Sequence, residues 1–429
     1  MPIQLKLDQQ SSDVALGMVL LCGDRVSSLT VHHGDDRMAL LHKLVTVYGA
    51  PVERLYLYTE YVEGLRVEDQ SAHELWQDLP SLRELFIRRY SIPIDQLAAP
   101  NLVHLALEQA SHNRSFATLS ILDVLRDCPL LETLFIVDWG VQENPTRDHS
   151  PVSLPHLRSI ELGVYEVHSG LVAHLHLPPN VAAGFRMLWE TDVGGDVPLE
   201  VVAAVQHVLR RIDIRCITLA APPHPQENKG GLLIRFAGLQ GSLEITTYRI
   251  YTHMQLWNAF FDARGVLFSY SPRIENVREL HIVGCSFEDG HRMDHINAAM
   301  PNLVSISFFH CEGPHIFGLL TPTDPSSPPF PHLERVMIFG PESELIGMTK
   351  ARRDHGVPLK TLIVGRAVGG FEYGHLEDYA VLGEFVEDLR VGCPTRVLEW
   401  GAGNEVLKVW SADGVPGPVS PTRKMMVPD

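Results

Sequence analysis

The chain has 429 residues, 45% of them hydrophobic, and its 35 basic and 52 acidic side chains give a formal net charge of −17. So many apolar residues can bury a large core, which excludes wholesale disorder. An acidic chain with no basic cluster is unsuited to binding nucleic acid or an anionic membrane surface, because both partners need lysine and arginine contacts. The six cysteines form no C-x-x-C pair, which is typical of reduced thiols in an intracellular protein.

An apolar stretch, VALGMVLLCG, occupies residues 14–23. It is far shorter than the ~20 residues that a membrane-spanning helix needs. It also follows Asp8 and Asp13, whereas a signal peptide begins with basic residues. We therefore expect no membrane segment and a location in the cytoplasm or nucleus.

An apolar triplet of the form L-x-x-L-x-L then recurs along the chain. Within two runs, at residues 26–162 and 277–364, its first positions are spaced by 20 to 30 residues, which is close to the period of leucine-rich repeats, roughly 20–29 residues. We expect each triplet to lie on a strand with its apolar members facing the core. The triplets are Val26/Leu29/Val31, Val52/Leu55/Leu57, Leu82/Leu85/Ile87, Leu102/Leu105/Leu107, Leu131/Leu134/Ile136, Leu157/Ile160/Leu162, Val277/Leu280/Ile282, Leu303/Ile306/Phe308, Leu333/Val336/Ile338 and Leu359/Leu362/Val364.

A proline precedes many of these triplets, as in LPSLRELFI at 79–87 and CPLLETLFI at 128–136. Proline cannot continue a helix and pushes its predecessor towards an extended conformation, so it marks a helix-to-strand turn. The segments between triplets have helical spacing, with Ser71-x-x-Glu74 as a capping box and with apolar faces at 38–48 and 116–125.

Strand and helix units of this size bury their apolar faces only by stacking on neighbours. We therefore predict an α/β fold: a leucine-rich-repeat-like αβ solenoid, or horseshoe, over residues 1–410, with parallel strands on the concave face. A doubly wound α/β sheet is the alternative, but it does not explain a triplet that recurs behind a proline. Residues 411–429 are expected to form a disordered tail.

The pattern loosens between about 170 and 272, where the middle segment either interrupts one solenoid or joins two. Val172/Leu175/Leu177 and Ile214/Ile217/Leu219 still fit the triplet, and GLLIRFAG and SLEITTYR suggest a hairpin. Further predictions are a helix at 254–265, a projecting Pro/Ser-rich loop at 321–331, an amphipathic helix at 378–392 through Leu382, Phe385, Val386 and Leu389, and two final strands, TRVLEW and EVLKVW.

The repeated x-P-x-L-x-x-L-x-L units, the acidic balance and the end pattern FVEDLRVGCPTRVLEWGAGNEVLKVW together resemble fungal (basidiomycete) F-box proteins with divergent leucine-rich repeats. The resemblance spans most of residues 15–410. Members of that group usually begin with an F-box, a helical module with a Leu-Pro-x-Glu-like motif that docks on the adaptor of a cullin-type ubiquitin ligase. This chain shows no such motif, so it is either a relative without an F-box or lacks its true N-terminus.

Catalytic signatures are absent from the sequence: there is no G-x-S-x-G, P-loop or G-x-G-x-x-G motif. His291 and His295 stand at i, i+4 in HRMDH, but they lack the glutamate of H-E-x-x-H and a third ligand. In a chain with 22 histidines such pairs arise by chance, and the segment 32–36 is best explained as a turn with an aspartate N-cap. We therefore predict no enzyme, no cofactor and no metal site.

With catalysis set aside, we expect the chain to bind a protein partner through the strand residues that alternate with the triplets. Aromatic residues, methionine and arginine are enriched among residues that dominate protein interfaces. Covering of these aromatic residues by the long loops or helices of the middle segment is an equally weighted alternative. The candidate partner-binding residues are Arg54, Tyr56, Tyr58, Glu84, Phe86, Arg88, Phe135, Phe309, Met337 and Phe339, and the same face also includes Thr133, Val137, Glu279, His281, Ser307 and Arg335.

The predicted function is non-enzymatic protein–protein recognition, resembling the substrate-binding part of F-box proteins. The alternative is a substrate receptor of a cullin-type ubiquitin ligase, with a cryptic or missing F-box that contacts the ligase adaptor. An enzymatic role would need a deep pocket with convergent polar groups in the 170–272 region.

Overall fold

A computed structural model of the chain divides into two compact units, unit 1 at Met1–Leu188 and unit 2 at Trp189–Asp429. The structure describes residues 3–7, 21–32, 41, 44–47, 49–58, 79–88, 97, 99–108, 116–137, 141–142, 150–164, 169–187, 199–220, 233–239, 241–247, 274–284, 296–309, 311, 315–324, 326–338, 342–365 and 376–392.

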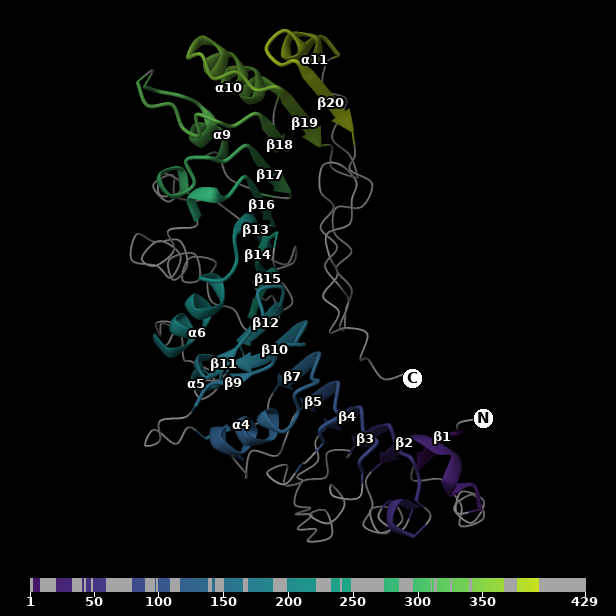
Figure 1. Cartoon of the computed structure of the whole chain (residues 1–429). Coiled ribbons are helices and arrows are strands. Elements are labelled where there is room, and N and C mark those ends of the chain that lie inside the picture. Colours follow the sequence, from purple (N-terminus) through teal and green to yellow (C-terminus); the bar gives the residue numbers. More distant parts are fainter. Residues whose placement is uncertain are drawn as a thin grey trace, which may run out of the picture. The chain divides into compact units, whose positions relative to one another are not determined.

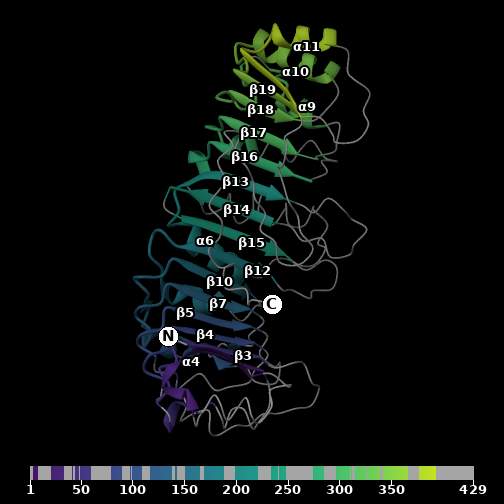
Figure 2. The ribbon, with the colours of Figure 1, turned by 90° about the vertical axis from the view of Figure 1, so that its right-hand side faces the viewer.

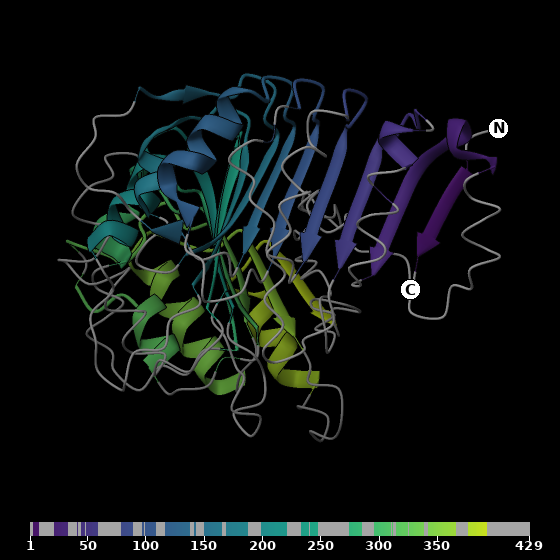
Figure 3. The same ribbon diagram turned by 90° about the horizontal axis from the view of Figure 1, so that it is seen from below.

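Unit 1 is a mixed α/β structure with a parallel sheet. Its main strands lie in the order β1-β2-β3-β4-β5-β7-β10-β12, and every neighbouring pair is parallel (Figure 3). The elements are β1 (Ile3–Leu7), η1 (Gly23–Arg25), β2 (Val26–His32), β3 (Arg54–Tyr58), β4 (Glu84–Arg88), β5 (His104–Glu108), β6 (Phe116–Ala117), α4 (Thr118–Arg126), β7 (Thr133–Val137), β8 (Val141–Gln142), β9 (Val152–Ser153), β10 (Ser159–Val164), α5 (Ser169–Ala173), β11 (Leu175–His176) and β12 (Ala182–Met187).

Unit 2 is also mixed α/β, and its strands lie in the order β15-β14-β13-β16-β17-β18-β19-β20 (Figure 2). The pairs from β13·β16 to β19·β20 are parallel, whereas β14 is antiparallel to both of its partners. The elements are α6 (Leu199–Leu209), β13 (Ile214–Ala220), β14 (Leu233–Gly238), β15 (Gly241–Thr247), η3 (Ile274–Asn276), β16 (Glu279–Val283), β17 (Ser305–Phe309), α9 (His315–Leu320), β18 (Arg335–Ile338), α10 (Glu342–Asp354), β19 (Thr361–Gly365), α11 (Leu376–Gly383) and β20 (Asp388–Gly392).

The apolar triplets form the core, as the sequence predicts. All thirty of their side chains are at most 2% exposed. Helix residues such as Leu122, Leu125, Leu345 and Met348 are equally buried, and in unit 2 the helices α9 and α10 lie along one side of the strands β16–β19 (Figure 1). We call the strand face that carries the triplets the core face, and the opposite face, formed by the alternating residues, the alternate face.

The recurrent proline occupies the corner of a turn that leads into several of the strands. In the first example, the Leu82 N–H donates to the Leu79 carbonyl at 3.2 Å, which places Pro80 second in a four-residue turn, where its fixed φ is favourable. The Asn101 side chain, third in the next turn, donates to the Pro80 carbonyl at 2.9 Å. Asn302 does the same for the Glu275 carbonyl in unit 2. The proline is therefore a turn residue as well as the helix stop that the sequence predicts.

A ladder of shared carbonyls joins successive repeats just before the strands. The Arg83 carbonyl accepts N–H bonds from both Val103 and His104, at 2.8 and 2.9 Å, and the Val103 carbonyl does the same for the next repeat. In unit 2 the Arg278 carbonyl accepts from Val304 and Ser305 at 2.8 and 2.9 Å. The same backbone device in both units indicates that the repeat predicted from the apolar residues is also a structural repeat.

The predicted helix at 378–392 is wrong in its second half. The helix α11 ends at Gly383, and residues 388–392 form β20, whose Leu389 pairs with Leu362 in parallel register. The residues Val386, Leu389 and Val391 fit the same triplet as the earlier strands. Their spacing also satisfies a helical period, and pairing with the exposed edge of β19 decides in favour of the strand.

In the middle segment, one predicted element is confirmed and one predicted strand lies at other residues. The strands β14 and β15 form the predicted hairpin, with Gly238 paired to Gly241. However, Leu175 does not belong to the main strands: β11 pairs with β9 in a separate two-stranded sheet. The main strand of this repeat is β12, with Val181, Ala183 and Phe185 buried, so the prediction placed it too early.

The Pro/Ser-rich loop at 321–331 does not project at its C-terminal end. Phe330 is fully buried at a φ of 49°. The buried guanidinium of Arg352 on α10 donates to the carbonyls of Leu320, Pro329 and Phe330 at 3.0 to 3.1 Å. One side chain thus ties both ends of the loop to the core.

No helix in the described part of the chain is both long and apolar enough to span a membrane. Several predictions fall outside the described residues, namely the helices at 71–80 and 254–265, the strands after residue 393 and the C-terminal tail.

Candidate functional site

The alternate face of unit 1 brings polar and aromatic side chains from successive repeats into register. Arg54 lies opposite Glu84, Tyr56 opposite Phe86, and Tyr58 opposite Arg88. Parallel register of this kind aligns equivalent positions of each repeat in rows across the strands. A residue predicted for this face therefore has its neighbours on the strands before and after it.

Ion pairs connect the charged residues of this face. The Arg54 and Glu84 side chains meet at 3.2 Å and the Arg88 and Glu108 side chains at 3.7 Å. The Tyr56 hydroxyl donates to Glu84 at 3.0 Å. Burial, followed by the negative charge of Glu84, raises the pKa of Tyr56 to about 12, so this hydroxyl stays a donor at neutral pH.

An aromatic cluster lies beside these charges. The rings of His32 and Tyr58 stack with centroids 5.3 Å apart, and Phe86 lies 5.3 Å from Tyr58 and 6.3 Å from Tyr56. Burial is also the main cause that raises the pKa of Tyr58. The Tyr58 hydroxyl is buried and has no hydrogen-bond partner within the described ranges.

A second aromatic and charged group lies on later strands of the same face. The Arg186 guanidinium is 5.2 Å from the centroid of the Phe135 ring, a cation–π geometry. Arg186 also forms an ion pair with Glu161 on the neighbouring strand. Phe135 is thus a partly exposed aromatic residue held next to a fixed positive charge.

The predicted partner-binding residues divide by burial. Arg54, Tyr56, Glu84, Arg88 and Phe135 are partly or fully exposed. In contrast, four others are at most 9% exposed; these are Tyr58, Phe86, Phe309 and Met337. Phe309 and Met337 belong to an apolar cluster with Ala220, Leu233 and Val283. Phe339 lies outside the described residues.

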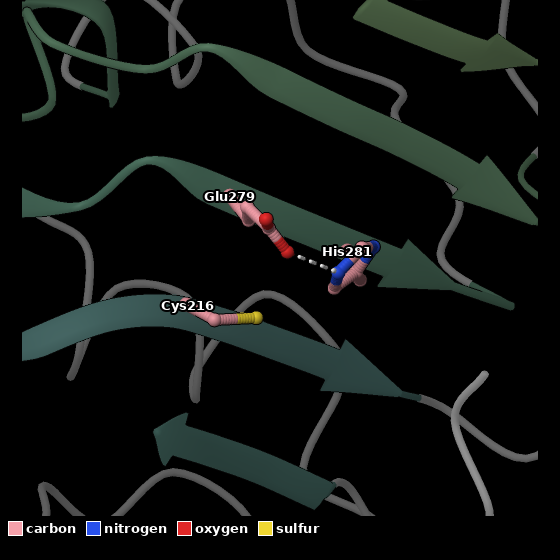
Figure 4. A group of neighbouring side chains, drawn as sticks. All are labelled: Cys216, Glu279 and His281. Carbon is pink, nitrogen blue, oxygen red and sulfur yellow. Dashed lines mark ion pairs between the residues drawn. The ribbon is translucent and has the colours of Figure 1, made fainter. Parts of the chain in front are cut away.

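The alternate face of unit 2 contains a group that sequence reasoning missed (Figure 4). Cys216 on β13 pairs in register with Glu279 on β16, and His281 follows two residues later on the same side of β16. One potential ligand atom from each of these three residues lies within 4.8 Å of the other two. The sequence placed Glu279 and His281 on this face, but it did not show that β13 is the neighbour of β16.

Charge and burial set the protonation of this group. Burial of His281 opposes its protonation, but its interactions with Cys216 and Glu279 prevail and raise the pKa of His281 to about 9. The interaction with His281 lowers the pKa of Glu279, against the effect of burial, and Arg335 contributes in the same direction. In the metal-free state the pair is therefore imidazolium and carboxylate at neutral pH.

The distance between His281 and Glu279 exceeds that of a close hydrogen bond. The His281 Nε2 lies 3.7 Å from Glu279 Oε2, which is longer than a standard hydrogen bond. The His281 Nδ1 is buried without a hydrogen-bond partner among the residues that are described. A thiol, an imidazole and a carboxylate at such distances are the ligand types of a transition-metal site.

The other histidine pair considered from the sequence, His291 and His295, lies outside the described residues. Comparison of the chain with protein-family models and with curated proteins finds no match.

Proposed function

We propose that the chain is a non-enzymatic protein-recognition module, built as an αβ solenoid of leucine-rich-repeat-like units, that binds its partner on the alternate face. The observation that carries the proposal is the row of partly exposed Arg54, Tyr56, Glu84 and Arg88 across adjacent parallel strands. Regularly stacked repeats suit this task, because they present one long surface to which each repeat contributes a few side chains.

Preorganisation of the side chains supports this choice. Arg54 and Tyr56 are both held by Glu84, and Arg88 is held by Glu108. Binding costs conformational entropy for each mobile side chain that it immobilises, so side chains that are already ordered lose less. Arginine and tyrosine are also among the residues that most often dominate binding energy at interfaces.

The sequence resemblance suggests the kind of partner. In F-box proteins the repeat region holds the substrate, so we propose that a protein substrate of comparable role binds here, in the cytoplasm or nucleus. The alternative, in which the chain itself engages the adaptor of a cullin-type ubiquitin ligase, differs in its partner and can be tested separately.

The test combines crosslinking with charge reversal. A photoreactive amino acid replaces Tyr56, and proteins that crosslink on illumination in a cell extract are identified by mass spectrometry. We expect a defined protein to crosslink from this position and to be lost when Arg54 and Arg88 are both changed to glutamate. The reversal of charge replaces the attraction between Arg54 and Glu84, and between Arg88 and Glu108, by repulsion. Glu84 and Glu108 then lack these ion-pair partners.

A matched control is Arg158→Glu. Arg158 is 75% exposed and pairs with Glu132 at 3.4 Å, but it precedes β10 and lies outside the proposed surface. Retention of the crosslink in Arg158→Glu and its loss in the double variant supports the proposal. Equal retention in both variants contradicts it, and stoichiometric binding of purified ligase adaptor by the chain favours the alternative.

A further inference from the structure

Unit 2 offers a second kind of binding site that is independent of the proposed protein recognition. The strand β14 pairs antiparallel with one edge of β13, and β15 pairs with β14. The other edge of β13 therefore pairs with β16. This arrangement brings the thiol of Cys216, the carboxylate of Glu279 and the imidazole of His281 together from two distant parts of the chain (Figure 4).

We propose that Cys216, Glu279 and His281 bind one divalent transition-metal ion, with Zn²⁺ as the best fit. The thiolate sulfur, an imidazole nitrogen and a carboxylate oxygen are the three ligands. A fourth position is left for water, as in zinc sites that hold the ion with three protein ligands.

The spacing of the ligand atoms supports the site. Bond lengths to zinc of about 2.0–2.3 Å in a tetrahedron place neighbouring ligand atoms about 3.4–3.6 Å apart. The nitrogen and oxygen of His281 and Glu279 are already 3.7 Å apart, and all three ligand atoms lie within 4.8 Å. Ligand atoms that lie farther apart than this in the structure must move closer together when the ion binds.

The balance of charge also fits a divalent cation. A thiolate and a carboxylate together neutralise the charge of Zn²⁺, so the occupied site carries no net charge beside the largely buried His281. When Nε2 of His281 binds the metal, the unpartnered Nδ1 carries a proton, as it also does in the imidazolium. Nδ1 therefore favours neither the metal-bound nor the metal-free state. The Glu279 side chain is 45% exposed, which leaves a path for the ion from solvent.

The ligand set selects the type of metal. Ca²⁺ and Mg²⁺ prefer oxygen ligands only, and one carboxylate does not provide them. Sulfur, nitrogen and oxygen ligands in one tetrahedral site are typical of Zn²⁺. Co²⁺ adopts the same site geometry and is visible in the absorption spectrum, so it serves as the probe.

The first experiment titrates the metal-free, full-length chain with Co²⁺ under reducing conditions. We expect one ion per chain, a near-ultraviolet absorption band from thiolate to cobalt, and loss of this band when Zn²⁺ is added. Binding without the thiolate band, as adventitious binding by surface histidines would give, overturns the proposal, and so does the absence of stoichiometric binding.

Variants assign the ligands. Cys216→Ser and Glu279→Gln preserve side-chain size and leave a fold that circular dichroism can check. Because loss of even an outer partner of a ligand weakens metal binding roughly 10- to 100-fold, loss of a ligand should weaken it at least as much. Cys22→Ser, at another half-buried free thiol, is the matched control and should bind Co²⁺ like the unaltered chain. Unchanged binding in Cys216→Ser contradicts the assignment.

A measurement on the unaltered chain avoids any question of misfolding. The half-buried thiols of Cys22, Cys216 and Cys311 are alkylated with and without Zn²⁺, and the labelled peptides are quantified by mass spectrometry. We expect Zn²⁺ to slow alkylation of Cys216 at least about tenfold, in line with a thiolate held by the metal, while the rates at Cys22 and Cys311 do not change. Equal rates at Cys216 with and without Zn²⁺ overturn the proposal.

Discussion

Arg352 is the residue whose environment departs most from what its chemistry would suggest. Its side chain is fully buried, and its guanidinium donates to the carbonyl oxygens of Leu320, Pro329 and Phe330. Burial lowers the pKa of Arg352 to about 10, so the group remains charged at neutral pH. A buried cation is costly unless its donors are used, and here three carbonyls provide the compensation.

Arg352→Ala should therefore strongly destabilise unit 2. The change leaves three carbonyls without this donor, and each buried unsatisfied polar group costs about 1–3 kcal/mol, so we expect a loss of about 3 kcal/mol or more in the free energy of unfolding. Urea denaturation followed by circular dichroism measures it. The neighbouring Arg353 is exposed and donates to the Glu384 carbonyl, so Arg353→Ala should cost less than about 1 kcal/mol. Similar losses in both variants would contradict this account.

The burial of His104 predicts how the stability of unit 1 changes with pH. Burial is the main cause that holds the pKa of His104 below 6.5; Glu84 and Glu132 act in the opposite direction, while Arg83 and Arg54 lower it further. Its Nδ1 also contacts the Thr133 hydroxyl. The folded state therefore binds this proton less readily than the unfolded state does.

The sign of the effect follows from proton binding. As pH falls through about 6.5, the unfolded chain gains a proton at His104 that the folded chain takes up only at lower pH, so stability decreases. We expect the unfolding free energy of His104→Gln to fall less steeply over this interval than that of the unaltered chain. Denaturation midpoints in a pH series provide the measurement, and parallel curves would show that burial does not depress this pKa.

At the scale of elements, the β14–β15 hairpin depends on a close approach at Gly238. A Cβ atom there would lie 2.3 Å from the Asp213 carbonyl oxygen and 2.8 Å from Ile212 Cγ2. The closer atom belongs to the backbone, which cannot move aside as a side chain does. The strand β14 can therefore lie this close to the start of β13 only with glycine at this position.

Gly238→Ala should destabilise unit 2 by about 1–3 kcal/mol, the usual cost of forcing extra atoms into a packed site. Gly347 is the matched control: it lies in α10, and a Cβ there would meet nothing within 4 Å. Because alanine favours helices over glycine, Gly347→Ala should stabilise by about 0.5–1 kcal/mol. Urea midpoints that shift in opposite directions confirm the prediction, and a tolerated Gly238→Ala would contradict it.

The elements also show where the sequence pattern is ambiguous. Residues 382–391 satisfy both a helical period and the strand triplet Val386/Leu389/Val391. The structure divides them: Leu382 lies buried in α11, whereas Leu389 lies half-buried in β20. Local periodicity cannot distinguish these outcomes, because the strand gains its hydrogen bonds only from β19, a segment that the pattern does not include.

At the scale of the whole molecule, the core faces of the two units are built alike and their alternate faces differ. Triplets, turn prolines and shared carbonyls recur in both. The alternate face of unit 1 carries ion pairs between arginine and glutamate. That of unit 2 carries an apolar cluster next to the Cys216 group. We accordingly propose different roles for them, protein recognition for the first and metal binding for the second.

The sequence alone determined the core and the strand register. Apolar residues at a fixed spacing can all be buried only if they share one face, and this local rule identified all ten triplets. It also placed Arg54, Tyr56 and Glu84 on the opposite face. Whether an alternating residue stays accessible depends on what lies over it, which is why Phe86 and Phe309 were not distinguished from Phe135.

Only the tertiary structure decided which strands are neighbours. The strand β16 follows β15 along the chain but pairs with β13. This is possible because β14 and β15 lie on the other side of β13. This pairing brings Cys216 next to Glu279 and His281, and no spacing along the sequence encodes it. Hydrophobic burial determines which face of a strand points to the core, and many strand orders satisfy it. The side chains of Cys216, Glu279 and His281 come together only when β13 and β16 are neighbours.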